Sequence, residues 1–165
     1  MTNDTKPTIK AVREPSDLAD TITLFRAYAT SWPIDLTYQD FEAEIAAMPG
    51  KYAPPKGDLL LARTSGGHPV GCVGLRPFGK ERECEMKRLY VAPEGRGTGL
   101  GGALAMRLIE TARGCQYAGL LLDTLPTMTE AQALYRRLGF VEIPAYYETP
   151  IVGTIFLRLD LTRGP

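Results

Sequence analysis

The spacing of apolar residues changes along the chain, and this change predicts where helices and strands lie. Apolar positions recur at helical intervals over residues 15–29, 38–48, 100–113 and 129–138, which predicts four helices. Short apolar runs bounded by turn residues predict seven strands, over residues 8–13, 58–64, 70–76, 82–91, 117–123, 140–143 and 154–161. This order is typical of a mixed α/β protein with an antiparallel first half.

A glycine-rich loop joins the predicted strand 82–91 to the predicted helix 100–113. Between Ala92 and Gly102 the chain carries glycine at positions 95, 97, 99, 101 and 102. Glycine lets the backbone approach a ligand closely, and the start of a helix offers unpaired N–H groups and the positive end of the helix dipole. The loop therefore predicts a site for a phosphate, and hence a cofactor that carries a pyrophosphate.

One interpretation of the loop is the dinucleotide-binding fingerprint GxGxxG, formed by Gly97, Gly99 and Gly102. Asp123 follows about 20 residues later, where the acidic residue that binds a ribose is expected.

Three observations make the dinucleotide interpretation a minor alternative. The strand before the loop carries Glu83, Glu85, Lys87 and Arg88, and we expect that a strand covered on both faces could not bury them at low cost. Five residues, 92–96, separate this strand from the first glycine of the fingerprint. Only about 40 residues follow Asp123, too few for the rest of a nucleotide-binding fold.

A second pattern fits the same loop better. The loop reads Arg96-x-x-Gly99-x-Gly101 after Val91-x-Pro93, and this resembles the acetyl-CoA pyrophosphate loop of the GNAT N-acetyltransferase superfamily. Residues 131–140, Ala-x-x-Leu-Tyr-x-x-Leu-Gly-Phe, are similar to a late helix of that family. The resemblance covers nearly the whole chain and is strongest from Glu85 to Phe140.

The resemblance implies a fold and a co-substrate. The expected fold is a central mixed, mostly antiparallel sheet of six to seven strands with about four helices, in a single domain over residues 8–165 after a flexible tail, 1–7. The expected co-substrate is acetyl-CoA. Its expected binding residues are Leu89, Tyr90, Val91, Arg96, Gly97, Thr98, Gly99, Leu100 and Gly101. Family members often have an asparagine that helps to hold the cofactor at the position of Met128, and the chain departs from the family pattern there.

The resemblance also implies the chemistry, which is direct attack of an amine on the thioester in a ternary complex. An alkyl amine is protonated at neutral pH, so a base is needed, and we expect Glu85 in this role. The alternative for Glu85 is a strand carboxylate that is solvated or paired with Lys87 or Arg88. By resemblance, the backbone N–H of Leu89 polarises the thioester carbonyl.

The resemblance implies that the phenol of Tyr135 gives a proton or a hydrogen bond to the departing sulfur of CoA. The alternative is a core tyrosine on an apolar helix face, in which case Tyr146 or Tyr147 would be substitutes. Cys84 should point away from Glu85 on the strand, which argues against a thiol nucleophile.

The acceptor is less defined by the sequence. In this fold the segments 28–35 and 146–154 build the mouth of the acceptor site, where Trp32, Tyr146 and Tyr147 could line a pocket. Asp35, Glu83 or Glu148 could hold a cationic amine. A small-molecule amine is favoured over a protein amine. A non-catalytic acyl-CoA sensor is the alternative from another functional class.

The composition of the chain limits the classes of partner that we expect it to bind. The formal net charge is zero, which argues against nucleic acid, and no apolar run is as long as a membrane span. The start of the chain has no apolar segment typical of a secretory signal, and the three cysteines have no metal-binding spacing. We therefore expect a cytoplasmic protein without a metal, and the resemblance also allows a homodimer.

Overall fold

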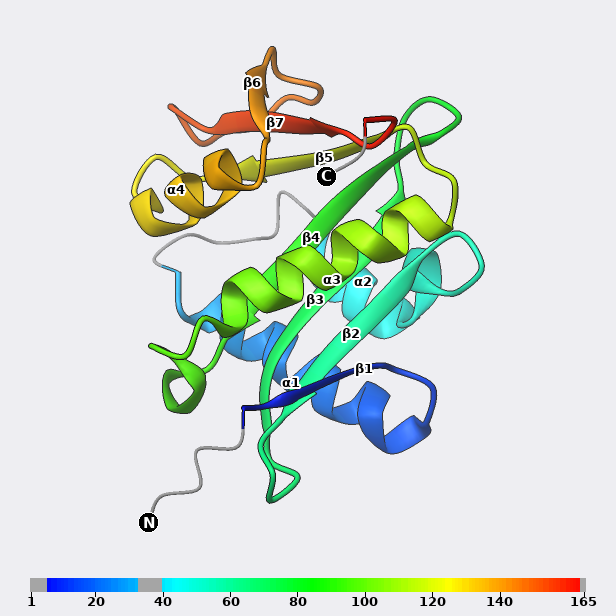
Figure 1. Cartoon of the computed structure of the whole chain (residues 1–165), viewed down its shortest axis with the longest axis vertical. Coiled ribbons are helices and arrows are strands. Elements are labelled where there is room, and N and C mark those ends of the chain that lie inside the picture. The colour runs from blue at the N-terminus through cyan, green and yellow to red at the C-terminus, as the bar shows by residue number, and fades with distance from the viewer. Residues whose placement is uncertain (1–5, 33–39, 164–165) are drawn as a thin grey trace.

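One seven-stranded sheet forms the centre of the molecule (Figure 1). The computed structural model describes residues 6–32 and 40–163. The strands are β1 (Thr8–Ala11), β2 (Asp58–Arg63), β3 (Pro69–Pro77), β4 (Glu83–Val91), β5 (Gly119–Thr124), β6 (Val141–Ile143) and β7 (Ile155–Asp160). They lie in the order β1-β2-β3-β4-β5-β7-β6, and β4–β5 is the parallel pair among antiparallel neighbours.

Helices cover both faces of the sheet. They are α1 (Pro15–Thr30), α2 (Phe41–Ala47), α3 (Leu100–Gly114) and α4 (Thr129–Arg137), with 3₁₀ turns η2 (Gly50–Tyr52) and η3 (Pro93–Gly95). Leu60 and Ala62 of β2 pack into one core cluster with α3 and α4, whereas Leu59 and Leu61 pack into a second cluster with α1 and α2. This alternation follows from the period of two along a strand, and it puts the two helix pairs on opposite faces.

The architecture confirms the predicted fold class, a mixed, mostly antiparallel sheet of seven strands flanked by helices. The boundaries of the predicted elements lie within a few residues of those in the structure. The largest difference is at the second helix, which was expected from residue 38 and begins at Phe41, next to residues outside the described range.

The charged residues of β4 require a correction. Glu85, Lys87 and Arg88 are 1%, 6% and 4% exposed, so the expectation that a covered strand could not bury them is wrong. Each is compensated by an ion pair: with Arg76, Asp123 and Glu44, respectively. The dinucleotide interpretation fails for a different reason, because β4 pairs antiparallel with β3 along most of its length.

Two irregularities in β4 prepare the site. Cys72 pairs with Tyr90 and Gly74 with Lys87, so Val73 alone faces both Arg88 and Leu89. This is a β-bulge, and Arg88 has a φ of 60° within it. On the other side, β4 and β5 pair only from Glu83–Gly119 to Glu85–Leu121. The strands separate beyond that point, which leaves the second half of β4 unpaired toward β5.

Candidate active site

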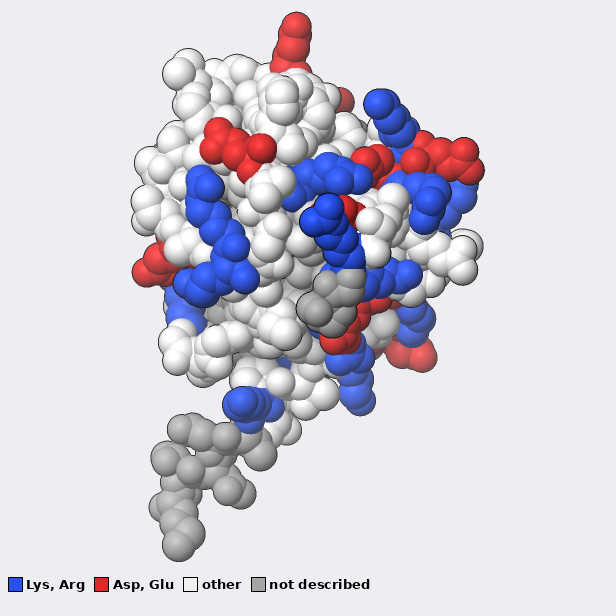
Figure 2. Space-filling model, turned by 45° about the horizontal axis from the view of Figure 1, so that its top comes forward, with Lys and Arg blue, Asp and Glu red and all other residues white. Residues whose placement is uncertain are grey.

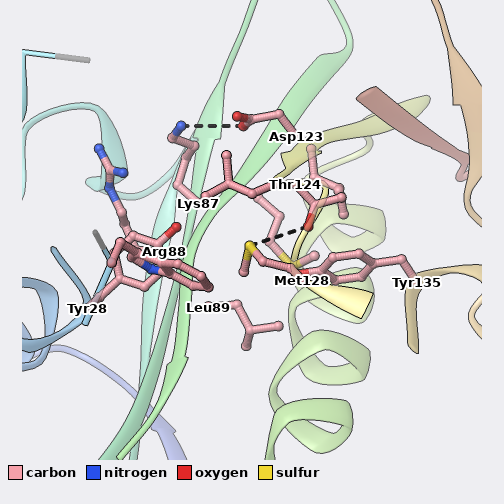
Figure 3. A pocket seen from close by; sticks show the side chains of 12 residues that line it. Tyr28, Lys87, Arg88, Leu89, Asp123, Thr124, Met128 and Tyr135 are labelled. Atoms are coloured by element: carbon pink, nitrogen blue, oxygen red, sulfur yellow. Dashed lines mark hydrogen bonds and ion pairs between the residues drawn. The ribbon is translucent and has the colours of Figure 1, made fainter. Parts of the chain in front are cut away.

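A cleft opens where β4 and β5 separate (Figure 3). Its walls come from α1, β4, β5, the segment that follows β5, and α4. The lining residues are Tyr28, Trp32, Met86, Lys87, Arg88, Leu89, Leu122, Asp123, Thr124, Leu125, Met128 and Tyr135. Met86, Leu122 and Tyr135 belong to the core on the α3–α4 side, whereas the neighbours Lys87 and Asp123 point to the opposite face. The cleft therefore joins the two faces of the sheet.

The glycine loop follows β4 and leads into α3, one of the helices on the α3–α4 face of the sheet. Gly97 and Gly99 have φ values of 79° and 77°, which favour glycine, and nothing lies within 4 Å of a Cβ built at either position. Thr98 Oγ1 donates to the carbonyl of Gly95 (2.7 Å), and Arg96 Nε donates to the carbonyl of Val91 (3.1 Å). The side chains thus brace the loop while its glycine backbone stays open on the outside.

The start of α3 adds donors to the loop. Gly99 is the N-cap and accepts a hydrogen bond from the backbone N–H of Ala103 at 3.1 Å. The N–H groups of the first helical turn precede any intrahelical acceptor, so they point outward as a set. An open glycine backbone, a helix start and an unpaired strand edge suit a ligand that combines a pyrophosphate with an amide-rich arm.

Tyr135 is packed by its ring and reaches the cleft. It is 6% exposed and lies 5.7 Å from the ring of Phe140, centroid to centroid. Its hydroxyl makes no hydrogen bond to another described residue, and the ring extends toward Met128 in the cleft (Figure 3). Burial raises the pKa of this phenol, so it remains a proton donor at neutral pH.

Met128 lies at the position where the resemblance implies asparagine. It lines the cleft, and its sulfur accepts a 3.5 Å hydrogen bond from Thr124 Oγ1 (Figure 3). A thioether is only a weak acceptor and cannot donate, so any polar contact here differs from that of an amide.

Glu85 lies at the last position where β4 pairs with β5, and both of its carboxylate oxygens have partners. Arg76 donates to Oε1 from Nη2 (2.7 Å) and Nε (2.9 Å), and Tyr146 Oη donates to Oε2 (2.6 Å). Arg76 is its cross-strand partner on β3, so the ion pair forms there in place of one with Lys87 or Arg88. Glu85 is not among the residues that line the cleft.

Asp123 is the carboxylate that does line the cleft, and our sequence reasoning assigned it only to the rejected ribose site. Its Oδ1 lies 3.7 Å from Lys87 Nζ (Figure 3), and its Oδ2 accepts a hydrogen bond from Tyr147 Oη at 2.7 Å. Burial lowers the pKa of Lys87, while the nearby carboxylates Glu85 and Asp123 oppose that shift. A close, buried cation and anion thus face the space between the strands.

A third ion pair holds the bulge of β4. Arg88 Nε donates to Glu44 Oε2 at 3.1 Å, and Tyr52 Oη donates to Glu44 Oε1 at 3.0 Å. The Arg88 guanidinium also lies 5.2 Å from the ring centre of Phe41. These contacts fix a non-glycine residue at positive φ, a conformation that persists only where the surroundings compensate its cost.

Comparison with known proteins assigns the chain to a family. Residues 21–140 match the family model described as the acetyltransferase (GNAT) family. The chain belongs to this family of N-acetyltransferases. An uncharacterized N-acetyltransferase of Schizosaccharomyces pombe is 41% identical over 155 residues, which cover 94% of this chain and 95% of that protein.

Solved structures agree with the GNAT assignment. A protein of Klebsiella pneumoniae assigned as an acyl-CoA N-acyltransferase is 29% identical, with a TM-score of 0.70 over 94% of this chain and 97% of that one. An acetyltransferase structure from Salmonella typhimurium that contains its cofactor acetyl-CoA is 19% identical, with a TM-score of 0.66 over 98% of this chain and 97% of that one. At that identity the second match supports the fold alone.

The residues predicted for the acceptor side of this GNAT protein lie in different places relative to the cleft. Trp32 lines the cleft, and its buried indole nitrogen makes no hydrogen bond to another described residue. Tyr146 and Tyr147 contact Phe156 edge to face with centroid distances of 5.0 and 5.2 Å, and their hydroxyls donate to Glu85 and Asp123. Asp35 lies outside the described residues.

The other two candidate carboxylates lie away from the cleft. Glu83 pairs with Arg158 at 3.0 Å, and Glu148 is exposed. Cys84 is buried in the α3–α4 core, on the face opposite Glu85 as expected, and burial raises the pKa of its thiol.

The wider surface bears on the expected partners. Figure 2 shows basic and acidic side chains interspersed with uncharged surface on one face of the molecule. Within the described residues, no helix is both long and apolar enough to span a bilayer, and no group of three or more His, Cys, Asp or Glu side chains could hold a metal ion. The absence of a nucleic-acid partner, the cytoplasmic location and the homodimer stay predictions.

Proposed function

We propose that this acetyltransferase moves an acetyl group from acetyl-CoA to the primary amine of a small molecule by direct attack in a ternary complex. The observation that carries the proposal is the cleft between the separated ends of β4 and β5. Backbone hydrogen-bond donors gather at its α3–α4 side and ionisable side chains at the opposite side. Acetyl-CoA and the acceptor amine can therefore enter from opposite faces of the sheet and meet inside it.

The glycine loop and the edge of β4 hold the donor. The N–H groups at residues 97–101 bind the pyrophosphate, and Arg96 adds a cation when its side chain turns from the carbonyl of Val91 to the ligand. The backbones of Leu89, Tyr90 and Val91 pair with the pantetheine arm as one strand pairs with another. The β-bulge supports this role, because Leu89 has no partner in the register with β3.

Polarisation of the thioester carbonyl falls to the backbone N–H of Leu89. A preorganised donor in a water-excluded site stabilises the negative charge that develops on oxygen during attack. The ion pair of Arg88 with Glu44 holds the bulge rigid, so this N–H keeps its direction without a reorganisation cost.

The acceptor ammonium loses two protons during the reaction. One passes to Glu85 through the hydroxyl of Tyr146, which donates to Glu85 Oε2, and then leaves to water. The other replaces the acyl group on sulfur, which Tyr135 supports by hydrogen bonding as negative charge develops there. Burial raises the thiol pKa values of Cys84 and Cys72, which supports direct transfer without an acyl-cysteine.

The acceptor side suits a small amine. Lys87, Asp123 and Glu85 are each at most 10% exposed by side chain, and Tyr146 and Tyr147, packed against Phe156, cover the carboxylates of Glu85 and Asp123 with their hydroxyls. A large folded substrate could not present its amine at that depth without moving this cover.

Calorimetric titration with acetyl-CoA, followed by initial-rate kinetics with an amine panel, tests the proposal. We expect saturable binding of acetyl-CoA and rate plots that intersect when both substrates are varied, as a ternary complex requires. Parallel plots would indicate a covalent acyl-enzyme and contradict direct transfer. Binding without transfer to any amine would favour the sensor function instead.

A further inference from the structure

The cleft between β4 and β5 is closed at one end by two apolar side chains. The last pair between the strands joins Glu85 to Leu121, so Met86 and Leu122 are the first residues of the opening on each strand. Both line the cleft, and they are only 4% and 2% exposed. Together these two side chains form the closed end of the cleft.

The closed end has little freedom to move. Met86 and Leu122 belong to the core cluster on the α3–α4 face, which also contains Leu104, Leu108 and Leu157, each 0% exposed. A close-packed core does not take up additional methylene groups without displaced side chains or a shifted backbone. A ligand that reaches the closed end therefore meets a firm boundary.

The free space inside the cleft is small. Its volume is about 40 Å³. One water-sized group needs about 10–15 Å³ of such volume, so only a few non-hydrogen atoms fit at once. This space suits a short acyl group better than a chain of several methylene groups.

The path of the donor leads to the closed end. In the proposed function, the pantetheine arm runs along β4 from Val91 to Leu89, whose N–H holds the thioester carbonyl. Leu89 and Val91 pack against the α3–α4 core, whereas Lys87 and Arg88 point to the opposite face. Met86 is thus the next side chain of β4 on the donor face, and the acyl group at the end of the arm points toward it.

We infer that Met86 and Leu122 select the acyl group of the donor and restrict it to acetyl among saturated acyl chains. A longer chain would have to displace the closed end or leave the thioester carbonyl away from the N–H of Leu89. A misplaced methylene group in an apolar pocket typically costs about tenfold or more in kcat/KM. This inference rests on the donor placement in the proposed function and adds the residues that select the acyl group.

A series of donors tests the inference on the wild-type protein. Acetyl-, propionyl-, butyryl- and hexanoyl-CoA are compared as donors to one amine that accepts acetyl groups. We expect kcat/KM to fall by about tenfold or more with each of the first two added methylene groups. Equal kcat/KM for acetyl-CoA and butyryl-CoA would overturn the inference.

Smaller side chains at the closed end should relax this selectivity. Met86→Ala and Leu122→Ala should each raise kcat/KM for butyryl-CoA relative to acetyl-CoA by about tenfold or more. Leu120→Ala is the matched control, since Leu120 lies on the same face of β5 but opposite Cys84 in the paired part of the sheet. It should lower stability as the other variants do and leave the ratio of donors unchanged.

A milder variant keeps the test open if the alanine variants do not fold. Leu122→Val removes a single methylene group from the closed end and should shift the ratio of donors in the same direction by a smaller factor. A selectivity that persists unchanged in every folded variant would show that other residues impose it, and would contradict the inference.

The outcomes separate this inference from the proposed function. If acetyl-CoA does not bind, both fail. If acetyl-CoA binds but no amine accepts its acetyl group, the proposed transfer alone fails, and calorimetry decides the inference. Butyryl-CoA should then bind about tenfold or more weakly than acetyl-CoA, and equal affinities would refute the inference. If butyryl-CoA is as good a donor as acetyl-CoA, acetyl transfer stands and the inference is wrong.

Discussion

The two halves of the cleft offer different chemical groups to a ligand. The donor half, from Val91 to Gly101, offers mainly backbone N–H groups on glycines and a helix start, with side chains used to brace the loop. The acceptor half is lined by the buried side chains of Lys87, Asp123 and Arg88, and the pair of Arg76 with Glu85 lies outside this lining. The difference suggests that the donor is recognised by local backbone geometry, whereas the acceptor and its protons are handled by tertiary contacts.

Of the predicted changes, loss of the proposed base, Glu85, should have the largest effect on turnover. Glu85→Gln keeps the size of the side chain and removes the group that accepts the proton, so turnover should fall by about 10²–10⁴ at neutral pH. The rate should recover partly at high pH, where the amine is already neutral. Initial rates across pH measure both effects.

The control for this variant is Glu83→Gln, which lies two positions away on β4 and pairs with Arg158. It should leave the pH profile of turnover unchanged. An unchanged rate and profile in Glu85→Gln would move the proton transfer to Asp123 or to water.

The hydroxyl of Tyr135 should matter for rate and little for folding. Tyr135→Phe keeps the buried ring, so the free energy of unfolding and acetyl-CoA affinity should change little, while turnover should fall by about 10². Tyr117→Phe, outside the cleft, is the comparison for loss of a phenol. A loss of stability with normal turnover per folded molecule would assign Tyr135 to the core.

Backbone recognition on the donor side predicts a loss of affinity from a single side chain on the loop. Gly99→Val should weaken acetyl-CoA binding by about tenfold or more, because the valine occupies the open space outside the loop and strains a φ of 77°. Gly79→Val is a closely matched control, since Gly79 has a φ of 70° and equally open surroundings in the β3–β4 turn. Equal affinities in the two folded variants, measured by calorimetry, would contradict the placement of the pyrophosphate.

The smallest effect concerns stability at alkaline pH. Burial, and then the nearby Glu85 carboxylate, raises the pKa of Tyr146. Above about pH 10 an unfolded tyrosine loses its proton while the folded one keeps it, so the folded state binds more protons and the free energy of unfolding falls as pH rises. Tyr146→Phe should reduce this decline by about 1 kcal/mol between pH 10 and 11 in urea titrations. An unchanged decline would show that Tyr146 does not cause it.

The same contrast explains what the sequence could predict. The donor half can be predicted from a local pattern, the spacing of glycines between a strand and a helix. The fold can be predicted from the periodicity of apolar positions. The acceptor half depends on contacts between residues distant in sequence. The strand register puts Arg76 opposite Glu85, Lys87 pairs with Asp123, and Tyr146 reaches Glu85 from the segment between β6 and β7. Local reasoning offered Lys87 or Arg88 as partners of Glu85, whereas the register put Arg76 opposite it.

Two backbone features also escaped prediction. The bulge at Arg88 adds one residue to β4, and nothing in the local sequence marks it, because arginine rarely adopts a positive φ. The point where β4 and β5 separate depends on the packing of both strands rather than on either sequence. Both features determine where the unpaired edge of β4 faces the cleft.

A crystal structure with a non-transferable acetyl-CoA analogue tests the central claim most directly. We predict the pyrophosphate on the N–H groups of residues 97–101, the pantetheine arm along β4 from Leu89 to Val91, and the acyl group inside the cleft beside Tyr135. An acyl group outside the β4–β5 cleft, or a pyrophosphate away from the start of α3, would contradict the account.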